Sequence, residues 1–269
     1  MPQEDAAWHD IDSHAYYEAR MVDLHTAEGQ QLAGCLSDEW AARMSFLLDA
    51  FEPQAHPAWC GYASLRIALR SCGAVRVPTQ QEMYEIVSRD ASVKPVRPDG
   101  SMAGGLSMSQ LERIVHLVAT TDLGFALDAE LVYGAERSQF EARLVADLCA
   151  SLEDGSVVLV NLLRTLGGRY GGHWSPLGGL TVSAGGEAYV LLLDVAAHRL
   201  GLHWVPLRML VACCCTLNMH GTPRGYLRVA AAGHPRGAVG AGVSDAGCRT
   251  VFVADAAGDN GDDTNLSMV

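Results

Sequence analysis

One cysteine of this sequence stands where a thiol could act as a nucleophile. Cys60 lies in the stretch 51–65, F-E-P-Q-A-H-P-A-W-C-G-Y-A-S-L, at a sharp turn into a predicted apolar helix. A helix N-terminus is partially positive, which favours the thiolate that attacks carbonyl carbon. Gln54, six residues upstream, has an amide that could hold a developing oxyanion together with the Cys60 backbone N–H. The spacing is typical of a cysteine hydrolase.

A nucleophilic cysteine needs a base, and the base needs a group that orients it. His173 is the best candidate base because Gly171 and Gly172 let its backbone approach another surface closely. Asp194 ends the apolar run 189–193, where an unpaired carboxylate would be costly. The two predicted strands are hairpin neighbours, so we expect these side chains to meet. The alternatives are a structural histidine and an aspartate that caps the following loop.

Apolar residues at helical spacing fill the first half of the chain. One helix is predicted over 40–51, and a second runs from Cys60 to near Gly73. Capping boxes, in which a Glu or Gln follows a hydroxyl residue by three positions, predict three more helix starts. These pairs are Thr79 with Glu82, Ser107 with Gln110, and Ser138 with Glu141.

The second half of the chain has the pattern of strands. The β-branched and aliphatic run 157–163 is typical of a buried strand. Segments 180–183 and 189–194 flank a short glycine turn, which predicts a hairpin, and 225–229 predicts another strand. We therefore expect an α+β fold with a helical N-terminal half, an antiparallel sheet in the C-terminal half, and an active cleft between them.

Composition narrows the class of protein. The 269 residues are 49% hydrophobic, enough for a substantial core. A net charge of −12 disfavours nucleic acid and anionic membranes as partners. The first ten residues, M-P-Q-E-D-A-A-W-H-D, lack the basic and apolar regions of a secretory signal, and no apolar run of about 18 residues could span a bilayer. These features predict a cytoplasmic protein.

Three parts of the chain are predicted from its composition and motifs. An N-terminal extension covers 1–20, a catalytic domain covers 21–231, and a tail rich in Gly, Ala and Asp covers 232–269. The tail has the composition of a disordered segment. The run Cys213-Cys214-Cys215 resembles a metal clip, but consecutive helical side chains point about 100° apart and cannot close a tetrahedral site alone. Buried helix packing is the favoured interpretation there.

The order Cys, His, Asp, with the cysteine on a helix and the others on strands, is that of papain-like enzymes. More specifically, the chain resembles the phytochelatin synthases in ordered motifs that span residues 27–226. The motifs are A-E-G-Q-Q-L at 27–32, Q-x-x-P-A-W-C-G at 54–61, G-G-H-W-S-P-L-G-G at 171–179, L-L-L-D-V-A at 191–196, H-W-V-P-L at 203–207 and R-G-Y at 224–226. The resemblance implies a papain-like α+β fold.

The resemblance also implies an acyl transfer from glutathione. Cys60 would attack the Cys–Gly bond, release glycine and keep γ-glutamylcysteine as a thioester. A second glutathione would accept the acyl group, giving phytochelatins, (γ-Glu-Cys)n-Gly, which bind heavy metal. In this scheme His173 moves protons and Asp194 holds its tautomer.

Glutathione carries two carboxylates, so its site needs cations. The resemblance points to Arg164 and Arg224 as substrate-binding residues, with Tyr226 beside Arg224 and Gly172 at the close backbone approach. The alternative for each arginine is a solvated surface position.

The chain departs from the family pattern in two places. Family members read D-V-A-R after the aspartate, whereas this chain has Ala197 in place of the arginine, and Arg199 could reach over. Where the family has an acidic residue before R-G-Y, this chain has Asn218. The extra cysteine pairs and the cysteine-rich C-terminal domain of the plant enzymes have no counterpart here. The layout resembles the short bacterial forms, which favour hydrolysis.

The resemblance implies no organic cofactor and no fixed protein metal site. Cadmium or zinc is expected as an activator bound as glutathione thiolate complexes, and glutathione and phytochelatin oligomers are the expected partners. The resemblance leaves a homodimer open. Two alternatives remain: a glutathione hydrolase or papain-like peptidase, and an inactive thiol-rich metal-binding protein, suggested by the missing arginine and by Cys213–Cys215.

Overall fold

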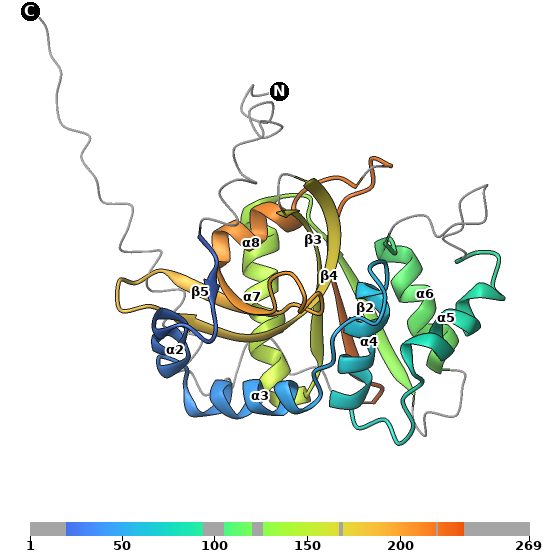
Figure 1. Cartoon of the computed structure of the whole chain (residues 1–269), viewed down its shortest axis with the longest axis horizontal. Coiled ribbons are helices and arrows are strands. Elements are labelled where there is room, and N and C mark those ends of the chain that lie inside the picture. Colours follow the sequence, from blue (N-terminus) through green and yellow to red (C-terminus); the bar gives the residue numbers. More distant parts are fainter. Residues whose placement is uncertain (1–19, 94–104, 120–125, 167–168, 219, 234–269) are drawn as a thin grey trace, which may run out of the picture.

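The structure, a computed structural model, describes residues 20–93, 105–119, 126–166, 169–218 and 220–233. Within these ranges the chain forms seven helices and one seven-stranded antiparallel sheet, the α+β class that the sequence predicts (Figure 1). The helices are α2 (Ala27–Gly34), α3 (Asp38–Asp49), α4 (Cys60–Ser71), α5 (Gln80–Ser88), α6 (Met108–Ala119), α7 (Arg137–Asp154) and α8 (Leu207–Cys214). The strands are β1 (Val22–Asp23), β2 (Leu127–Tyr133), β3 (Val157–Leu166), β4 (Arg169–Val182), β5 (Ala188–Leu193), β6 (Leu202–Pro206) and β7 (Gly225–Ala231).

Strand β4 connects the two parts of the sheet. The strand order is β1-β6-β5-β4-β3-β7-β2. Residues 169–176 of β4 pair with β3, and residues 177–182 pair with β5. The register shifts between Leu177 and Gly179, an irregularity of the kind that lets a long strand bend. The predicted hairpin is therefore confirmed as β4 and β5, with His173 on the first strand and Asp194 directly after the second.

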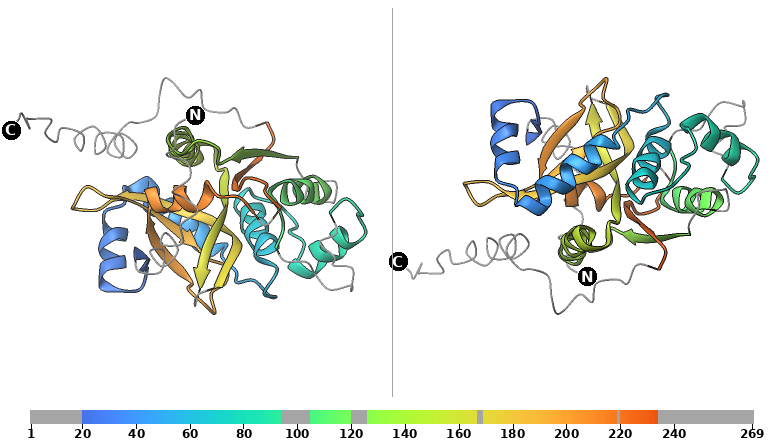
Figure 2. Two further views of the ribbon diagram at one scale, coloured as in Figure 1. Left: turned by 90° about the horizontal axis from the view of Figure 1, so that it is seen from above. Right: turned by 90° about the horizontal axis from the view of Figure 1, so that it is seen from below.

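Two hydrophobic cores lie on opposite faces of β3. Val157 and Leu159 pack in the core shared with α4, α5 and α6, whereas Val158 and Val160 pack in the core shared with α7 and α8. This alternation confirms that β3 is a strand buried on both faces, as its run of apolar residues predicts. Helix α2 lies at one end of the molecule and α5 and α6 lie at the other (Figure 2).

Two of the three predicted capping boxes form. The Thr79 side chain accepts from the Glu82 backbone while Glu82 accepts from the Thr79 backbone, at the start of α5. Ser107 and Gln110 make the same reciprocal pair at the start of α6, at 3.2 and 2.8 Å. The third predicted helix also forms, but without its capping box. Helix α7 begins at Arg137, ahead of Ser138, and the Ser138 hydroxyl donates to the Glu136 carboxylate instead of capping the helix.

The division into a helical half and a sheet half is only approximately right. Strand β2 comes from the predicted helical half and pairs with β7 at the edge of the sheet, and α8 lies within the sheet half. The N-terminal extension before residue 20 and the tail beyond residue 233 lie outside the described residues. None of the helices described has both the length and the apolar character needed to cross a bilayer.

Candidate active site

Cys60 is the first residue of α4, as predicted, and its side chain is buried. Its sulfur faces Gly105, where a Cβ would stand 4.0 Å from Sγ, so residue 105 leaves space beside the thiol. The backbone N–H groups of Cys60, Gly61 and Trp174 lower the pKa of the thiol, and so does the charge of Arg164. Burial has the larger effect and raises the pKa of Cys60. The helix start therefore favours the thiolate, as predicted from the sequence, while burial of the side chain opposes it.

His173 and Asp194 meet as the hairpin predicts. Nε2 of His173 lies 2.9 Å from Oδ1 of Asp194, and both side chains are buried. Because a carboxylate only accepts, this contact assigns the ring proton to Nε2 and leaves the lone pair on Nδ1. The same carboxylate accepts from the Ala196 backbone N–H at 2.8 Å and from the guanidinium of Arg164. Asp194 is thus fully hydrogen-bonded and holds the imidazole in one tautomer.

The imidazole of His173 is neutral near pH 7. Burial lowers its pKa well below 6.5, and the positive charges of Arg164 and Arg199 lower it further. A neutral imidazole with its lone pair on Nδ1 can accept a proton, which is the property that a base for a nucleophilic thiol needs.

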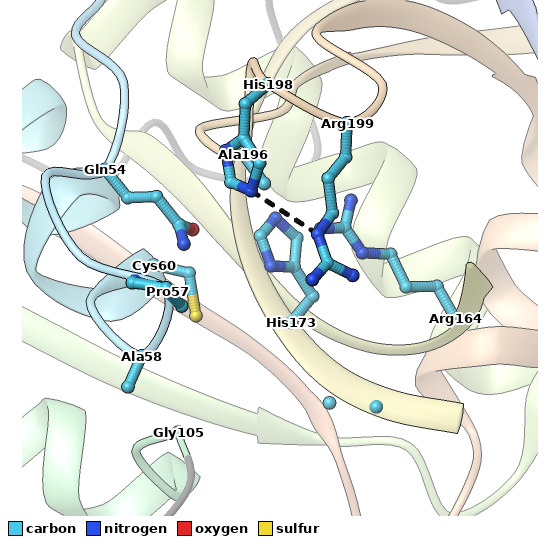
Figure 3. A pocket seen from close by; sticks show the side chains of 12 residues that line it. Gln54, Pro57, Ala58, Cys60, Gly105, Arg164, His173, Ala196, His198 and Arg199 are labelled. Atoms are coloured by element: carbon cyan, nitrogen blue, oxygen red, sulfur yellow. Dashed lines mark hydrogen bonds between the residues drawn. The ribbon is translucent and has the colours of Figure 1, made fainter. Parts of the chain in front are cut away.

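These residues open onto a cavity of about 270 Å³ (Figure 3). Gln54, Pro57, Ala58 and Cys60 form its wall on the side of α4, and His173 stands across from them. None of its lining residues is acidic, so the cavity is suited to an anionic ligand. The full lining is Gln54, Pro57, Ala58, Cys60, Gly105, Arg164, Gly171, Gly172, His173, Ala196, His198 and Arg199.

Gln54 projects into this cavity from the loop before α4 (Figure 3). Its Nε2 donates to the His56 carbonyl at 3.0 Å, which uses one of its two N–H bonds. Its backbone N–H donates to the Val195 carbonyl at 2.8 Å, which ties the loop to the segment that follows Asp194. The second Nε2 hydrogen is thereby left for an oxyanion held against Cys60.

A residue that the sequence did not single out holds the Gln54 loop in place. The buried amide of Gln80 accepts from the Ala55 N–H at 2.9 Å and donates to the Pro53 carbonyl at 2.9 Å and to Glu52 at 2.7 Å. No local pattern marks Gln80 for this role, because its partners lie about 25 residues earlier in the chain.

The structure separates the four predicted substrate-binding residues. Arg164 and Gly172 line the cavity, although the Arg164 guanidinium also pairs with Asp194. Arg224 lies behind Gly172, where a Cβ would stand 2.5 Å from its NH1, and NH1 donates to Asn161 at 2.7 Å. Tyr226 lies away from the cavity: its ring is fully buried and its hydroxyl donates to Asp147 of α7 at 2.6 Å.

The two departures from the family pattern have distinct structural settings. Ala197 is exposed and outside the cavity lining, while Arg199 lines the cavity, and so does His198. Asn218 accepts from the His220 and Thr222 backbones at 2.8 and 3.0 Å, so its side chain holds a turn.

The cysteine run packs as predicted. Cys213 and Cys214 are buried in the core beside α7, and burial raises the pKa of both thiols, of Cys213 to about 12. A raised pKa disfavours the thiolate that binds metal. Within the described ranges, no three His, Cys, Asp or Glu side chains are arranged to hold a metal ion.

Comparisons with known proteins agree on one family. The sequence model of the phytochelatin synthase family matches residues 15–226. The chain is 26% identical over 229 residues to glutathione gamma-glutamylcysteinyltransferase 1 of Triticum aestivum, covering 77% of this chain and 40% of that protein. It is 25% identical over 188 residues to the Lotus japonicus protein of the same name, covering 69% and 35%. The chain therefore spans about two fifths or less of the length of these relatives.

Proposed function

The chain belongs to the phytochelatin synthase family, and from this premise we propose that it releases glycine from glutathione through a thioester on Cys60. The observation that carries the proposal is the 2.9 Å contact between His173 Nε2 and Asp194 at the cavity that Cys60 lines. The contact gives the base its orienting carboxylate, and the base lines the same cavity as the cysteine, the arrangement that acyl transfer needs.

The first half-reaction forms the thioester. Cys60 Sγ attacks the carbonyl carbon of the Cys–Gly bond while His173 Nδ1 takes the thiol proton. The carbonyl oxygen gains negative charge and is held by the Gln54 amide and the Cys60 N–H. Collapse of the adduct breaks the C–N bond, His173 returns its proton to the nitrogen, and glycine leaves. Asp194 stabilises the imidazolium during this step.

The second half-reaction transfers the γ-glutamylcysteinyl group. The α-amine of a second glutathione attacks the thioester, gives a proton to His173, and displaces the Cys60 sulfur, which recovers the proton. The product is a phytochelatin, and repetition lengthens it. If water attacks instead, the product is γ-glutamylcysteine. The loss of arginine at Ala197 and of the acid at Asn218 favours water, since both departures remove groups that could bind the acceptor.

Cations around the cavity support glutathione as the substrate. Arg224 is buried and makes no ion pair with any described residue, so a substrate carboxylate beside Gly172 would complete its contacts. Arg164 also lines the cavity, although Asp194 balances its charge. Tyr226 acts at a distance at most, since its hydroxyl is taken by Asp147.

The remaining parts of the proposal follow from family membership. The α+β fold is of the papain-like type, with α4 carrying the nucleophile against the sheet that carries the base. Cadmium or zinc enters as glutathione thiolate complexes and so as part of the substrate. The protein acts in the cytoplasm, and it can do so as a homodimer.

Product analysis tests the function. The protein is incubated with millimolar glutathione, with and without cadmium, and the products are followed by mass spectrometry beside a Cys60→Ser control. Oligomers (γ-Glu-Cys)n-Gly that require Cys60 establish a synthase. Free γ-glutamylcysteine with glycine establishes a hydrolase. Absence of both products, or equal product from Cys60→Ser, refutes the thioester reaction.

A further inference from the structure

Arg199 presents an open guanidinium to the cavity (Figure 3). A turn after Asp194 places it there, closed by the Arg199 N–H donating to the Ala196 carbonyl at 2.8 Å. Its Nε donates to His198 Nε2 at 3.4 Å, a long contact that leaves the two terminal nitrogens directed elsewhere. Those nitrogens make no hydrogen bond or ion pair to any residue in the described part of the chain.

The other two arginines near the cavity are each held by a polar side chain of the protein. Arg164 is paired with Asp194, and Arg224 donates to Asn161 behind Gly172. No acidic residue lines the cavity to neutralise Arg199. Its guanidinium is therefore a free fork of N–H donors, the geometry that binds a carboxylate.

The position of Arg199 indicates which carboxylate it meets. Gln54 and Cys60 lie on one side of His173, and the Arg199 guanidinium lies on the other (Figure 3). It is close enough for its charge to lower the pKa of the imidazole. His173 must give its proton to the departing nitrogen, so the leaving group lies on the His173 side of the thiol. In glycine the carboxylate is one carbon from that nitrogen.

The acceptor amine should occupy the place that the glycine nitrogen has left. His173 gives a proton to the glycine nitrogen in the first half-reaction and takes one from the acceptor amine in the second. The acceptor amine of glutathione belongs to the γ-glutamyl residue, which carries a free carboxylate on the same carbon as the amine. The leaving group and the acceptor are thus chemically alike. Each is an α-amino acid whose amine nitrogen is bonded to, or attacks, the carbonyl carbon of the γ-glutamylcysteinyl group.

We propose that Arg199, oriented by His198, forms a subsite for the carboxylate of an α-amino acid, occupied by the leaving glycine in the first half-reaction and by the acceptor in the second. The inference rests on the proposed thioester reaction and deepens it. Arg199 is here a residue that determines specificity on the leaving-group and acceptor side, while Arg224 serves the other carboxylate of the donor.

Masking one carboxylate tests the first half of the inference. The donors are glutathione and its C-terminal amide, γ-Glu-Cys-glycinamide, and release of glycine or glycinamide is measured with wild type and Arg199→Gln. Loss of charged hydrogen bonds should lower kcat/KM for glutathione about 10- to 100-fold. The value for the amide should stay within about twofold, because it lacks the glycine carboxylate that Arg199 would bind. Arg89→Gln, which changes an exposed arginine outside the cavity, should alter neither.

Equal losses on both donors, or no loss on either, overturn the subsite. If the wild-type protein releases neither glycine nor glycinamide, the proposed reaction is refuted. The carboxylate subsite is then tested by ligand binding alone. Titration of Cys60→Ser with glutathione and with its amide then gives the readout. The subsite is supported if Cys60→Ser binds glutathione more tightly than the amide and the added change Arg199→Gln removes this difference. Equal affinity of Cys60→Ser for the two ligands refutes it.

Isotope exchange tests the second half. With unlabelled glutathione and labelled free glycine, the thioester should return label to glutathione, and Arg199→Gln should lower this exchange relative to hydrolysis by about tenfold. Labelled glycinamide should be used as poorly by wild type as by the variant. Exchange that is insensitive to Arg199 would mean that the acceptor carboxylate binds elsewhere.

Discussion

Two aspartate-centred networks of similar side chains lie beside this sheet, and only one of them opens onto the cavity that Cys60 lines. In the first, which we call the active-site network, Asp194 joins His173 and Arg164. In the second, the tyrosine network, Asp147 accepts from the Tyr226 hydroxyl at 2.6 Å and from Arg143 at 2.9 Å.

The networks differ in what lies beside them. The active-site network opens onto the cavity that Cys60 lines, and its arginine side chain is only 5% exposed. The tyrosine network lies beside α7, none of its three residues lines that cavity, and its arginine side chain is 45% exposed. Burial and the Asp147 acceptor both raise the pKa of Tyr226 above its usual range, so its hydroxyl keeps its proton. The two networks contain similar side chains, and we expect only the one that a substrate can reach to take part in catalysis.

Changing the aromatic residue of each network, His173 or Tyr226, should give the largest difference in activity between the two networks. His173→Ala should lower kcat/KM for glycine release about 10³-fold, because it removes the proton acceptor. Tyr226→Phe should leave the rate within about twofold and lower the free energy of unfolding by about 1 kcal/mol, the value of one buried hydrogen bond. A comparable rate loss in both variants would contradict the division.

Neutralising each aspartate should cost unequal amounts of stability. Asp194→Asn leaves Arg164 buried without a counter-charge, which should lower the free energy of unfolding by about 3–5 kcal/mol. Asp147→Asn should cost about 1–2 kcal/mol, because Arg143 reaches solvent and still pairs with Glu130. Urea denaturation at pH 7 measures both. Equal costs would show that exposure of the arginine is irrelevant.

Acid should weaken the fold through the histidine beside the active-site network. Burial lowers the pKa of His203 to about 4, so between pH 6.5 and 4 the unfolded chain binds a proton that the folded chain does not. Stability is then complete above pH 6.5 and falls as the pH drops towards 4, by about 3 kcal/mol. His203→Gln should remove this share of the loss and make the slope shallower, while the share due to His173, whose pKa burial also lowers, remains. His116→Gln, at an exposed position on α6, is the control and should leave the slope unchanged.

The smallest of the four effects is expected at Gln54, on the wall of the cavity opposite His173. Gln54→Ala should lower kcat about 10²-fold with little change in KM, because the oxyanion exists only along the reaction path. Gln81→Ala, which removes an exposed glutamine bonded to Glu85, should leave both constants unchanged. A rise in KM without a fall in kcat would assign Gln54 to substrate binding instead.

The sequence predicts the core of the site because each part has a local signal. Cys60 starts a helix after a turn, and a glycine turn makes neighbours of the strands that bring His173 and Asp194 together. The roles of Gln80 and Arg199 depend on loops placed by tertiary packing, which no local pattern reports.

Two other features depend on the whole fold. The helix N-terminus stabilises a thiolate at Cys60, but the larger effect is burial, which local sequence does not report. Tyr226 is close to Arg224 in sequence, yet alternation along β7 points it into the core beneath α7. Strand β2 was missed because it lies among helices in the sequence and finds its only strand partner, β7, at the end of the described chain.

The contact between Gly172 and Arg224 restricts the order in which this site can evolve. Any side chain at position 172 would have a Cβ 2.5 Å from a guanidinium that Asn161 holds in place. A side chain at 172 therefore requires the Arg224 guanidinium to move and to weaken its bond to Asn161, while shortening Arg224 first meets no such obstacle. A side chain at 172 is thus easiest to accept in a descendant whose residue 224 is shorter, and such a descendant has also given up the cation at that place.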